Sequence, residues 1–187
     1  MNAGPERARD ELVGLARAAG RGDTRALADL VHRTSPTVWR ACAALVDRAS
    51  AEDLTQDTYL RAIRSLPTFR GECDPTRWLL TIARRVCAEE ISRRQRSRAT
   101  LHRLHAEPQP LAGDPAGAAD LDDALARLRP ERREALVLTA VAGLSYAEAA
   151  LVCGCPIGTI RSRVARARTD LITRLSDTEP VPERRPA

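Results

Sequence analysis

One stretch near the carboxyl end, Gly143 to Arg168, constrains the fold of this chain more than any other, because it carries the start and stop signals of two short helices. Ser145, followed three residues later by Glu148, forms a capping box at the start of the first helix. Gly154 favours the left-handed conformation that ends a helix, and the next residue but one, a proline, suits the first turn of the next. Apolar residues then recur at helical spacing, at Ile157, Ile160, Val164, Ala167 and Leu171. The stretch therefore predicts two helices around a tight turn.

The second of these helices is basic on the face that turns away from the apolar stripe. Four Arg and no acidic residue lie between Pro156 and Arg168, and small residues occupy the centre of the face. Such a surface suits a helix that enters the major groove of duplex DNA. The candidate DNA-contacting residues are Thr159, Arg161, Ser162, Arg163 and Arg166. A solvated Arg-rich helix of an unrelated protein is the alternative, and the capping box, glycine turn and proline together favour a helix-turn-helix DNA reader.

The charge of the whole chain also favours an anionic partner. The net charge is +5, and all 30 basic residues are Arg, whose planar guanidinium suits phosphate and guanine edges. No apolar run reaches the length of a membrane span. The composition therefore indicates a protein that binds nucleic acid, and no membrane contact is expected.

The five cysteines form an odd, scattered set without a preceding signal peptide, so a disulfide framework is not expected and the cytoplasm is the expected location. Cys153 and Cys155 lack the two-residue spacing of zinc ligand pairs, and no histidine lies near them. We expect these two residues to pack rather than to react, with no metal and no cofactor.

The first half of the chain predicts a small helical bundle. Apolar residues recur at helical spacing from Leu12 to Val46, and the pattern is interrupted twice. The first interruption, at Gly20 to Gly22, is followed by Asp23 as a helix cap. At the second, Ser35–Pro36, we expect the chain to restart in a new helix.

The next helix, residues 51 to 66, combines an apolar side with an acidic one. Ser50 is its expected N-cap, and Tyr59, Leu60 and Ile63 are expected to face inward. Its exposed side is expected to carry Asp53 and Asp57, one turn apart, with Gln56 beside them at the edge of the core. Leu54 lies beside the acidic pair, where it is either an anchor for a partner or a core residue covered by another helix; the pattern leaves both open. Because no histidine or nucleophile lies nearby, the carboxylates indicate a protein contact rather than a catalytic site.

A loop bounded by Pro67 and Pro75 leads into a helix from Thr76 to Arg94 whose far end is basic. Six Arg lie between Arg84 and Arg98 against only two acidic residues, Glu89 and Glu90. Aromatic residues on a loop beside an Arg-rich helix are typical of surfaces that hold unstacked single-stranded bases. For Trp78 we favour core packing, whereas the role of Phe69 on the loop stays open.

The remaining composition divides the chain into two all-α domains. Residues 99–119 are rich in proline and glycine and lack a helical stripe, as a flexible linker does. Short helices near Leu121 and after Pro130 then lead into the helix-turn-helix. We expect a first domain at 1–98, a linker at 99–119, a second domain at 120–176 and a disordered tail at 177–187.

With both halves in view, the chain resembles the extracytoplasmic-function (ECF) sigma factors, group 4 of the bacterial sigma-70 family. In the first half the resemblance rests on AEDLTQDTYLRA (residues 51–62) and WLLTIARRV (78–86). In the second half it rests on LRPERREALVL (128–138), GLSYAEAA (143–150) and GCPIGTIRSRVARAR (154–168). The resemblance implies a sigma region 2 bundle and a sigma region 4 helix-turn-helix, in an alternative sigma factor that directs promoter-specific initiation.

The same resemblance implies roles for single residues. Asp53, Gln56 and Asp57, with Leu54 beside them, match positions that grip the beta-prime coiled coil of core RNA polymerase. The loop from Phe69 to Thr76 matches the segment that captures an unstacked base of the −10 element, and the basic helix after it lies beside that element. The implied −10 residues are Phe69, Arg70, Cys73, Arg84, Arg85, Arg93 and Arg94. The residues named above on the last helix are implied to read the −35 element.

The implied partners are core RNA polymerase, through its beta-prime and beta subunits, and promoter DNA; whether an anti-sigma factor also binds is left open.

The chain departs from the family pattern at two positions. Arg85 occupies a position where many relatives have Asn, and Cys73 lies inside the base-capturing loop. Two other functions are alternatives for a chain with these features. A stand-alone repressor or activator would use only the second domain and bind duplex DNA without polymerase. An enzyme would use the cysteine pair or the acidic pair, and the resemblance implies no enzymatic activity.

Overall fold

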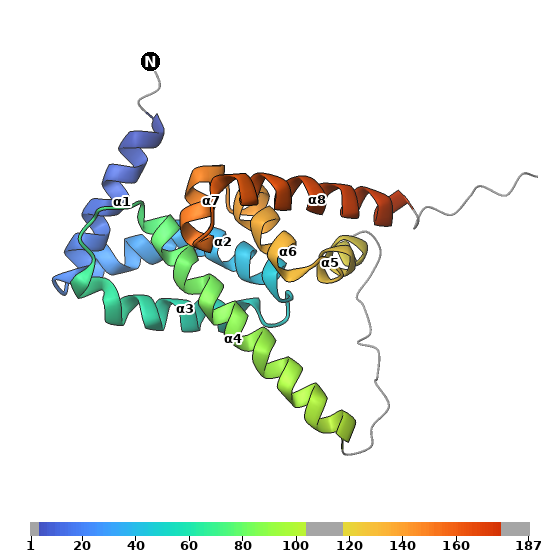
Figure 1. Ribbon diagram of the computed structural model, residues 1–187. Coiled ribbons are helices and arrows are strands. Elements are labelled where there is room, and N and C mark those ends of the chain that lie inside the picture. The colour runs from blue at the N-terminus through green and yellow to red at the C-terminus, as the bar shows by residue number, and fades with distance from the viewer. Residues whose placement is uncertain (1–3, 104–117, 177–187) are drawn as a thin grey trace, which may run out of the picture.

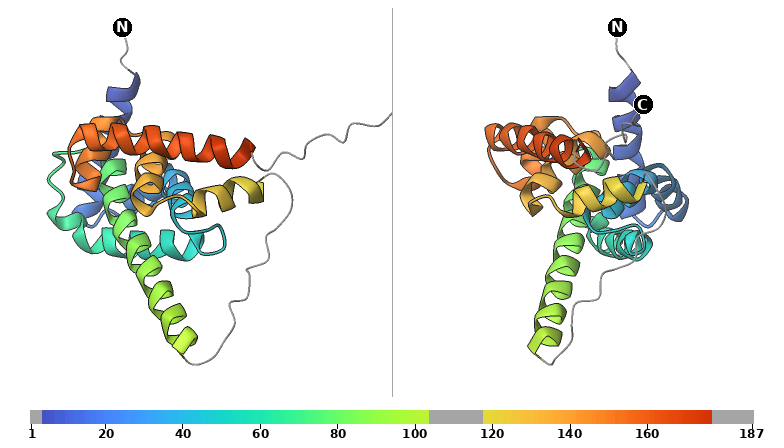
Figure 2. Two further views of the ribbon diagram at one scale, coloured as in Figure 1. Left: turned by 45° about the vertical axis from the view of Figure 1, so that its right-hand side comes forward. Right: turned by 90° about the vertical axis from the view of Figure 1, so that its right-hand side faces the viewer.

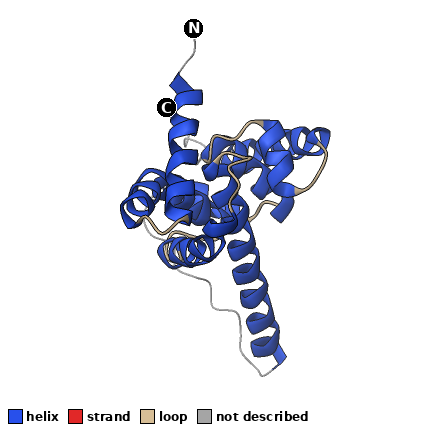
Figure 3. Ribbon diagram, turned by 90° about the vertical axis from the view of Figure 1, so that its left-hand side faces the viewer, coloured by secondary structure: helices blue, strands red, loops and turns tan. Residues whose placement is uncertain are grey.

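The computed structural model describes residues 4–103 and 118–176, and within these ranges the chain consists of helices and loops without a strand (Figures 1 and 3). The first half contains α1 (Gly4–Gly20), α2 (Thr24–Leu45), α3 (Ala51–Ser65), the 3-10 helix η1 (Leu66–Thr68) and α4 (Pro75–Arg103). The second half contains α5 (Ala118–Ala126), α6 (Pro130–Leu136), the π-helix η2 (Val137–Val141), α7 (Tyr146–Cys153) and α8 (Ile157–Ser176). The predicted all-α fold is confirmed.

Helix α4 is longer than the sequence pattern predicts. It continues to Arg103, past the predicted start of the linker at residue 99, and its carboxyl half projects beyond the rest of the molecule (Figure 2). Most of the predicted linker and the whole predicted tail lie outside the described residues.

The predicted break at Ser35–Pro36 is wrong, because α2 runs through Pro36 without interruption. A proline in a helix removes one hydrogen bond, but burial on the opposite face can hold the helix together. Leu30, Thr34 and Val38 are all buried on that face, and the Thr34 hydroxyl donates to the Leu30 carbonyl oxygen at 2.6 Å. The start of α2 is as predicted: Asp23 Oδ1 accepts hydrogen bonds from two backbone amides of the first turn, at 2.9 and 3.0 Å.

The predicted N-cap of α3 is also wrong. Ser50 has a helical backbone conformation and makes no side-chain cap bond. Its amide instead donates to Asp47 Oδ1 at 2.8 Å, and its hydroxyl oxygen accepts from Arg94 of α4. Ser50 thus ties the connection between α2 and α3 to α4.

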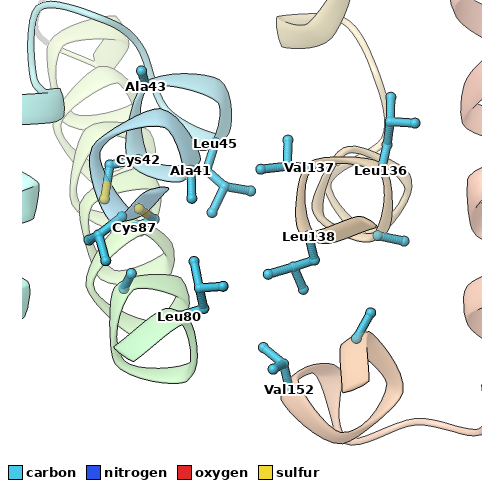
Figure 4. Packing of buried hydrophobic residues seen from close by; sticks show 14 of the residues in the cluster. Ala41, Cys42, Ala43, Leu45, Leu80, Cys87, Leu136, Val137, Leu138 and Val152 are labelled. Carbon is cyan, nitrogen blue, oxygen red and sulfur yellow. The ribbon is translucent and has the colours of Figure 1, made fainter. Parts of the chain in front are cut away.

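The two halves share one hydrophobic core. Buried residues of α2, α3 and α4 form a single continuous cluster with those of α5, α6, η2, α7 and α8. In Figure 4, Leu45 and Leu80 of the first half lie across from Val137, Leu138 and Val152 of the second. The two predicted domains are therefore packed against each other in this structure rather than held apart.

A half-buried arginine reinforces that packing. Arg133 of α6 reaches across to the end of α2, where its guanidinium donates to the carbonyl oxygens of Ala44 at 2.6 Å and Val46 at 3.1 Å. These carbonyls belong to the last turn of a helix, where the backbone leaves acceptors unsatisfied. The second half thus caps a helix of the first.

Candidate functional site

The helix-turn-helix predicted from the sequence is formed by α7 and α8. At its start Ser145 Oγ accepts from the Glu148 amide at 3.2 Å, while the Ser145 amide donates to the Glu148 carboxylate at 2.9 Å. At the turn Gly154 has a left-handed conformation, with φ of +64°. Both signals are confirmed, and they fix where α7 begins and ends.

Helix α8 presents a basic ridge to solvent. Its inner stripe, Ile160, Val164 and Ala167, is buried against α6 and α7. Arg161, Ser162 and Arg166 are exposed, while Thr159 and Arg163 are half-buried. Ile157, predicted to lie on the inner stripe, is 41% exposed, because it occupies the first residue of the helix beside the turn.

Within the described part of the chain, neither Arg161 nor Arg166 forms an ion pair, so both guanidinium groups are available to an anion. Arg163 differs from them, because its guanidinium lies against the Cys155 sulfur at 3.8 Å. The ridge therefore consists of two available arginines around a hydroxyl, a spacing that suits phosphate and base-edge contacts in a groove.

The acidic end of α3 is exposed at Asp53, as predicted, and Gln56, predicted at the edge of the core, is exposed as well. Gln56 donates to the neighbouring Glu52 carboxylate at 3.2 Å, so the two side chains form one polar surface with Asp53. Asp57 has a different environment. Arg61 pairs with Asp57 at 2.9 Å and also with Glu89 of α4 at 2.7 Å, which ties Asp57 into the contact between α3 and α4.

Of the apolar residues of α3 predicted to face inward, Tyr59 is buried but Leu60 and Ile63 are not. Leu54 is only 7% exposed, so it belongs to the core and does not serve as an anchor for a partner. Leu60 and Ile63, predicted to face inward, are 58% and 42% exposed. The reason is that Thr55 and Thr58 take the inward positions, since each hydroxyl donates to a carbonyl one turn earlier at 2.7 Å and needs no water.

The exposed apolar residues of α3 border a shallow groove of about 360 Å³ between α2 and α3. Its walls are mostly apolar, and the acidic surface of α3 meets it at Glu52 and Gln56. The lining residues are Val31, Ser35, Glu52, Thr55, Gln56, Tyr59, Leu60 and Ile63. The sequence pattern did not predict this groove, because it placed Leu60 and Ile63 in the core.

The loop between η1 and α4 carries a mixture of fixed and exposed residues. The Phe69 ring packs on Trp78 with the centroids 5.1 Å apart, which answers the open question about Phe69: it is partly packed. Arg70 points into solvent, with 83% of its side chain exposed, and Cys73 is half-buried. Asp74 ends the loop by accepting from the Thr76 amide at 2.7 Å, which caps α4.

The four candidate arginines of α4 have three different environments. Arg85 is exposed and has no ion pair among the described residues. Arg84 pairs with Glu134 of α6, in the second half of the chain. Arg93 and Arg94 both bind Glu90, at 2.7 and 2.6 Å.

Arg94 has a structural role in addition, because it also binds Asp47 and Ser50 in the connection between α2 and α3. Burial raises the pKa of Asp47, but the hydrogen bonds from Arg94 and Ser50 outweigh it, and the net effect is a lowered pKa. The carboxylate is therefore ionised at neutral pH. Of the four arginines, Arg85 alone stands exposed without an ion pair in the described residues, and Arg84 becomes available only if Glu134 leaves.

The thiol of Cys153 is difficult to ionise. Burial raises the pKa of the Cys153 thiol to about 12, so this thiol stays protonated at neutral pH and is a weak nucleophile. Among residues 4–103 and 118–176, no cluster of three or more His, Cys, Asp or Glu side chains could bind a metal ion. No helix in the same ranges has the length and apolar character needed to cross a membrane.

Each half of the chain matches a known protein family. Residues 30–97 match the family model "Sigma-70 region 2", and residues 118–171 match "Sigma-70, region 4". The chain is 48% identical over 178 residues to the ECF RNA polymerase sigma factor SigC of Mycobacterium tuberculosis, covering 91% of this chain and 94% of that protein.

Two solved structures have the same arrangement of helices. One is the sigma factor RpoE in complex with the anti-sigma factor NepR from Bartonella quintana, with a TM-score of 0.69 and 30% identity, covering 82% of this chain and 98% of that one. The other is CnrH in complex with the cytosolic domain of CnrY, with a TM-score of 0.72 and 26% identity, covering 90% of this chain and 99% of that one.

Proposed function

Because this chain belongs to the ECF sigma factors of the sigma-70 family, we propose that its exposed surfaces divide the work of transcription initiation between the two halves. The protein is an alternative sigma factor, which binds core RNA polymerase and directs initiation at specific promoters. We assign polymerase docking and the −10 element to a first domain at residues 1–98. We assign the −35 element to a second domain at 120–176, with residues 99–119 as the linker.

The observation that carries this assignment is that one chain presents both an arginine ridge and an acidic–apolar surface. The ridge on α8, with Arg161, Ser162 and Arg166 exposed, supports contact with −35 duplex DNA. Thr159 and Arg163 lie at its edge and are assigned a supporting role. Because guanidinium contacts with phosphate release counterions, this binding weakens steeply as salt rises.

The polymerase-docking surface is proposed to be the acidic end of α3 together with the groove beside it. Asp53 and Gln56 supply polar contacts, and Leu60 and Ile63 supply the apolar anchors that bury on association. This surface suits a helical partner with basic and apolar side chains, such as the beta-prime coiled coil that the family resemblance implies. The beta subunit is the proposed contact of the second domain.

The −10 element is proposed to meet the loop at Phe69, Arg70 and Cys73 and the exposed face of α4 at Arg85. Arg84 joins this surface only after its ion pair with Glu134 breaks. Arg93, on the exposed side of the same helix, is proposed to contact the DNA as well. Arg94 is assigned a structural role, because it holds the connection between α2 and α3 through Asp47. Unstacking a base costs a few kcal/mol, which capture of that base by the loop offsets.

Simultaneous contact with both elements requires the halves to move apart. The −35 and −10 elements lie roughly two helical turns apart on duplex DNA, or about 70 Å. In the closed structure, α8 packs on α6 and α7, which in turn pack on the core of α2 and α4. We propose that polymerase binding separates the halves and so frees Arg84.

Two further parts of the proposal concern the cell. Both solved relatives are complexes with a second protein: RpoE with the anti-sigma factor NepR, and CnrH with the cytosolic domain of CnrY. We propose that an anti-sigma protein is a partner of this chain as well, and that the site of action is the cytoplasm, where polymerase and promoters meet. The proposed activity uses binding energy alone, without enzymatic chemistry, as in the regulatory proteins of this family.

The docking surface is tested with reconstituted transcription and a direct binding measurement to core polymerase. Asp53→Arg and Leu60→Glu are each expected to weaken polymerase binding at least tenfold, because they invert a charge and place a charge in an apolar contact. Both side chains are exposed, so the melting temperature is expected to stay the same.

Asp29→Arg is the matched control, because Asp29 is an exposed acid of α2 that does not line the groove. Its polymerase affinity should equal that of the unaltered chain. Full polymerase binding by both α3 variants would show that the groove is not the docking surface.

A further inference from the structure

Helix α1 lies outside the segment that matches the region 2 family model, which begins at residue 30. In the structure, however, α1 runs alongside the connection between α3 and α4 (Figure 1). Ala16 of α1 and Leu66 of η1 are buried in one small cluster, and Phe69 and Trp78 pack against it. The aromatic pair of the loop therefore rests partly on α1.

The approach between α1 and this connection is close at two glycines. A side-chain carbon added at Gly20 would lie 2.6 Å from the carbonyl oxygen of Leu66, so only glycine lets the end of α1 sit against η1. A carbon added at Gly71 would lie 2.6 Å from Nε of Arg17 and 2.7 Å from one of its terminal nitrogens. The Arg17 guanidinium thus lies directly against the backbone of the loop.

Arg17 also bonds to the residue before that glycine. Its terminal nitrogen donates to the carbonyl oxygen of Arg70 at 2.7 Å. Gly71 itself has φ of +74°, a left-handed conformation that turns the chain sharply after Arg70. One guanidinium therefore holds the carbonyl on one side of the turn and covers the glycine on the other.

We infer that Arg17 is a positioning residue for the −10 element: it holds the backbone turn at Arg70–Gly71, so that the loop is ordered before an unstacked base arrives. The inference rests on the proposed function, in which this loop captures that base. Its physical basis is that a loop fixed in its binding conformation loses less conformational freedom on association. Arg17 does not touch the DNA; it acts through the Arg70 carbonyl.

An arginine suits this role better than a lysine. The planar guanidinium bonds to the carbonyl through one terminal nitrogen while its Nε and Cζ lie against the glycine, whereas an ammonium offers only a point charge. Arg17→Lys should therefore restore part of the function that Arg17→Ala removes.

The test uses the holoenzyme formed from core polymerase and the full chain. The probe is a −35 duplex that ends in single-stranded DNA across the −10 element, taken from a promoter selected by the unaltered holoenzyme. Arg17→Ala is expected to weaken binding to this probe by about fivefold, the loss of one hydrogen bond to a loop, while binding to the −35 duplex alone stays unchanged. The affinity of Arg17→Lys for the single-stranded probe should lie between that of Arg17→Ala and that of the unaltered chain.

Arg33→Ala is the matched control. Arg33 of α2 pairs with Glu11 of α1 at 2.9 Å, so this variant also removes an exposed contact between α1 and the bundle but leaves the loop untouched. It should bind both probes like the unaltered chain. A merely structural role of Arg17 would give Arg33→Ala and Arg17→Ala the same binding, and that result would overturn the inference.

A loop variant separates failure of this inference from failure of the proposed function. Phe69→Ala combined with Arg70→Ala alters the loop itself and leaves Arg17 in place. If this variant binds the single-stranded probe normally, the proposed role of the loop is wrong. If it binds weakly while Arg17→Ala binds normally, only the positioning role is wrong.

Discussion

Glu90 is the carboxylate most closely surrounded by arginines in this molecule's described residues. Its side chain is 14% exposed and accepts hydrogen bonds from Arg93 at 2.7 and 2.8 Å and from Arg94 at 2.6 Å. These bonds lower its pKa to about 2, from a usual value near 4.5. A carboxyl group whose pKa is lowered by folding stabilises the folded state above its unfolded pKa, and this contribution is lost as pH falls toward the folded pKa.

We therefore expect the chain to lose part of its stability between about pH 4.5 and pH 2, and Glu90→Gln to lack that part of the loss. Denaturant unfolding at a series of pH values measures both. At pH 7 the variant should be less stable than the unaltered chain, and the difference should shrink as pH falls. Asp29→Asn controls for removal of one exposed carboxylate, and a pH-independent difference would contradict this prediction.

Residues 54 and 60 of α3 show what sequence can and cannot say about a single side chain. Helical spacing placed both correctly on one helix, and the resemblance placed that helix at a partner surface. Which leucine is exposed depends on Thr55 and Thr58, whose hydroxyls are satisfied inside the helix and so can be buried. A hydrophobic pattern counts threonine as polar, and for that reason it placed Leu60 on the buried side of α3 instead of Thr55 and Thr58.

At the scale of elements, the turn between α7 and α8 depends on one backbone conformation. Gly154 has φ of +64°, and an added side-chain carbon would meet no atom within 4 Å. Gly154→Ala therefore isolates the cost of a left-handed backbone, about 1 kcal/mol, without a steric clash. We expect that loss in the free energy of unfolding, together with weaker −35 binding.

Gly154→Asn is the informative comparison, because Asn tolerates the left-handed conformation better than Ala. It should recover part of both losses, and chemical denaturation with a duplex-binding assay measures them. Equal losses for the two variants would show that the conformation of Gly154 is not the cause.

Other elements were less predictable for a physical reason. The cap at Asp23 and the box at Ser145 are local contacts, which is why short-range signals identified both. The continuity of α2 through Pro36 depends instead on burial against α3, where the Tyr59 hydroxyl bonds to Thr34 at 2.6 Å. Local sequence signals do not contain such a contact between helices.

At the scale of the whole molecule, Arg133 is the contact that most directly joins the halves. It bonds to two carbonyls at the end of α2, and burial lowers its pKa. We expect Arg133→Ala to weaken the closed arrangement by roughly 1–3 kcal/mol, the cost of two lost hydrogen bonds to a charged group. Small-angle X-ray scattering should then show a larger radius of gyration.

Arg132→Ala is the control for that measurement. Arg132 pairs with Asp170 at 2.6 Å inside the second half, so its loss leaves the contact between the halves intact. Its radius of gyration should match that of the unaltered chain. An unchanged radius for Arg133→Ala would mean that the apolar contacts alone hold the halves together.

The sequence predicted the helices of each half well and their mutual packing not at all. Leu45, Leu80, Val137 and Val152 each belong to an apolar stripe, and a stripe does not state which helix covers it. Only the structure shows that part of each stripe covers the other half.

The shared core also has a consequence for the life of the protein in a crowded cell. A chain that opened with no polymerase at hand would present Leu80, Val137 and Leu138 to water, and such surfaces drive self-association and attract proteases. The closed arrangement therefore keeps these side chains out of water in copies of the protein that are not bound to polymerase.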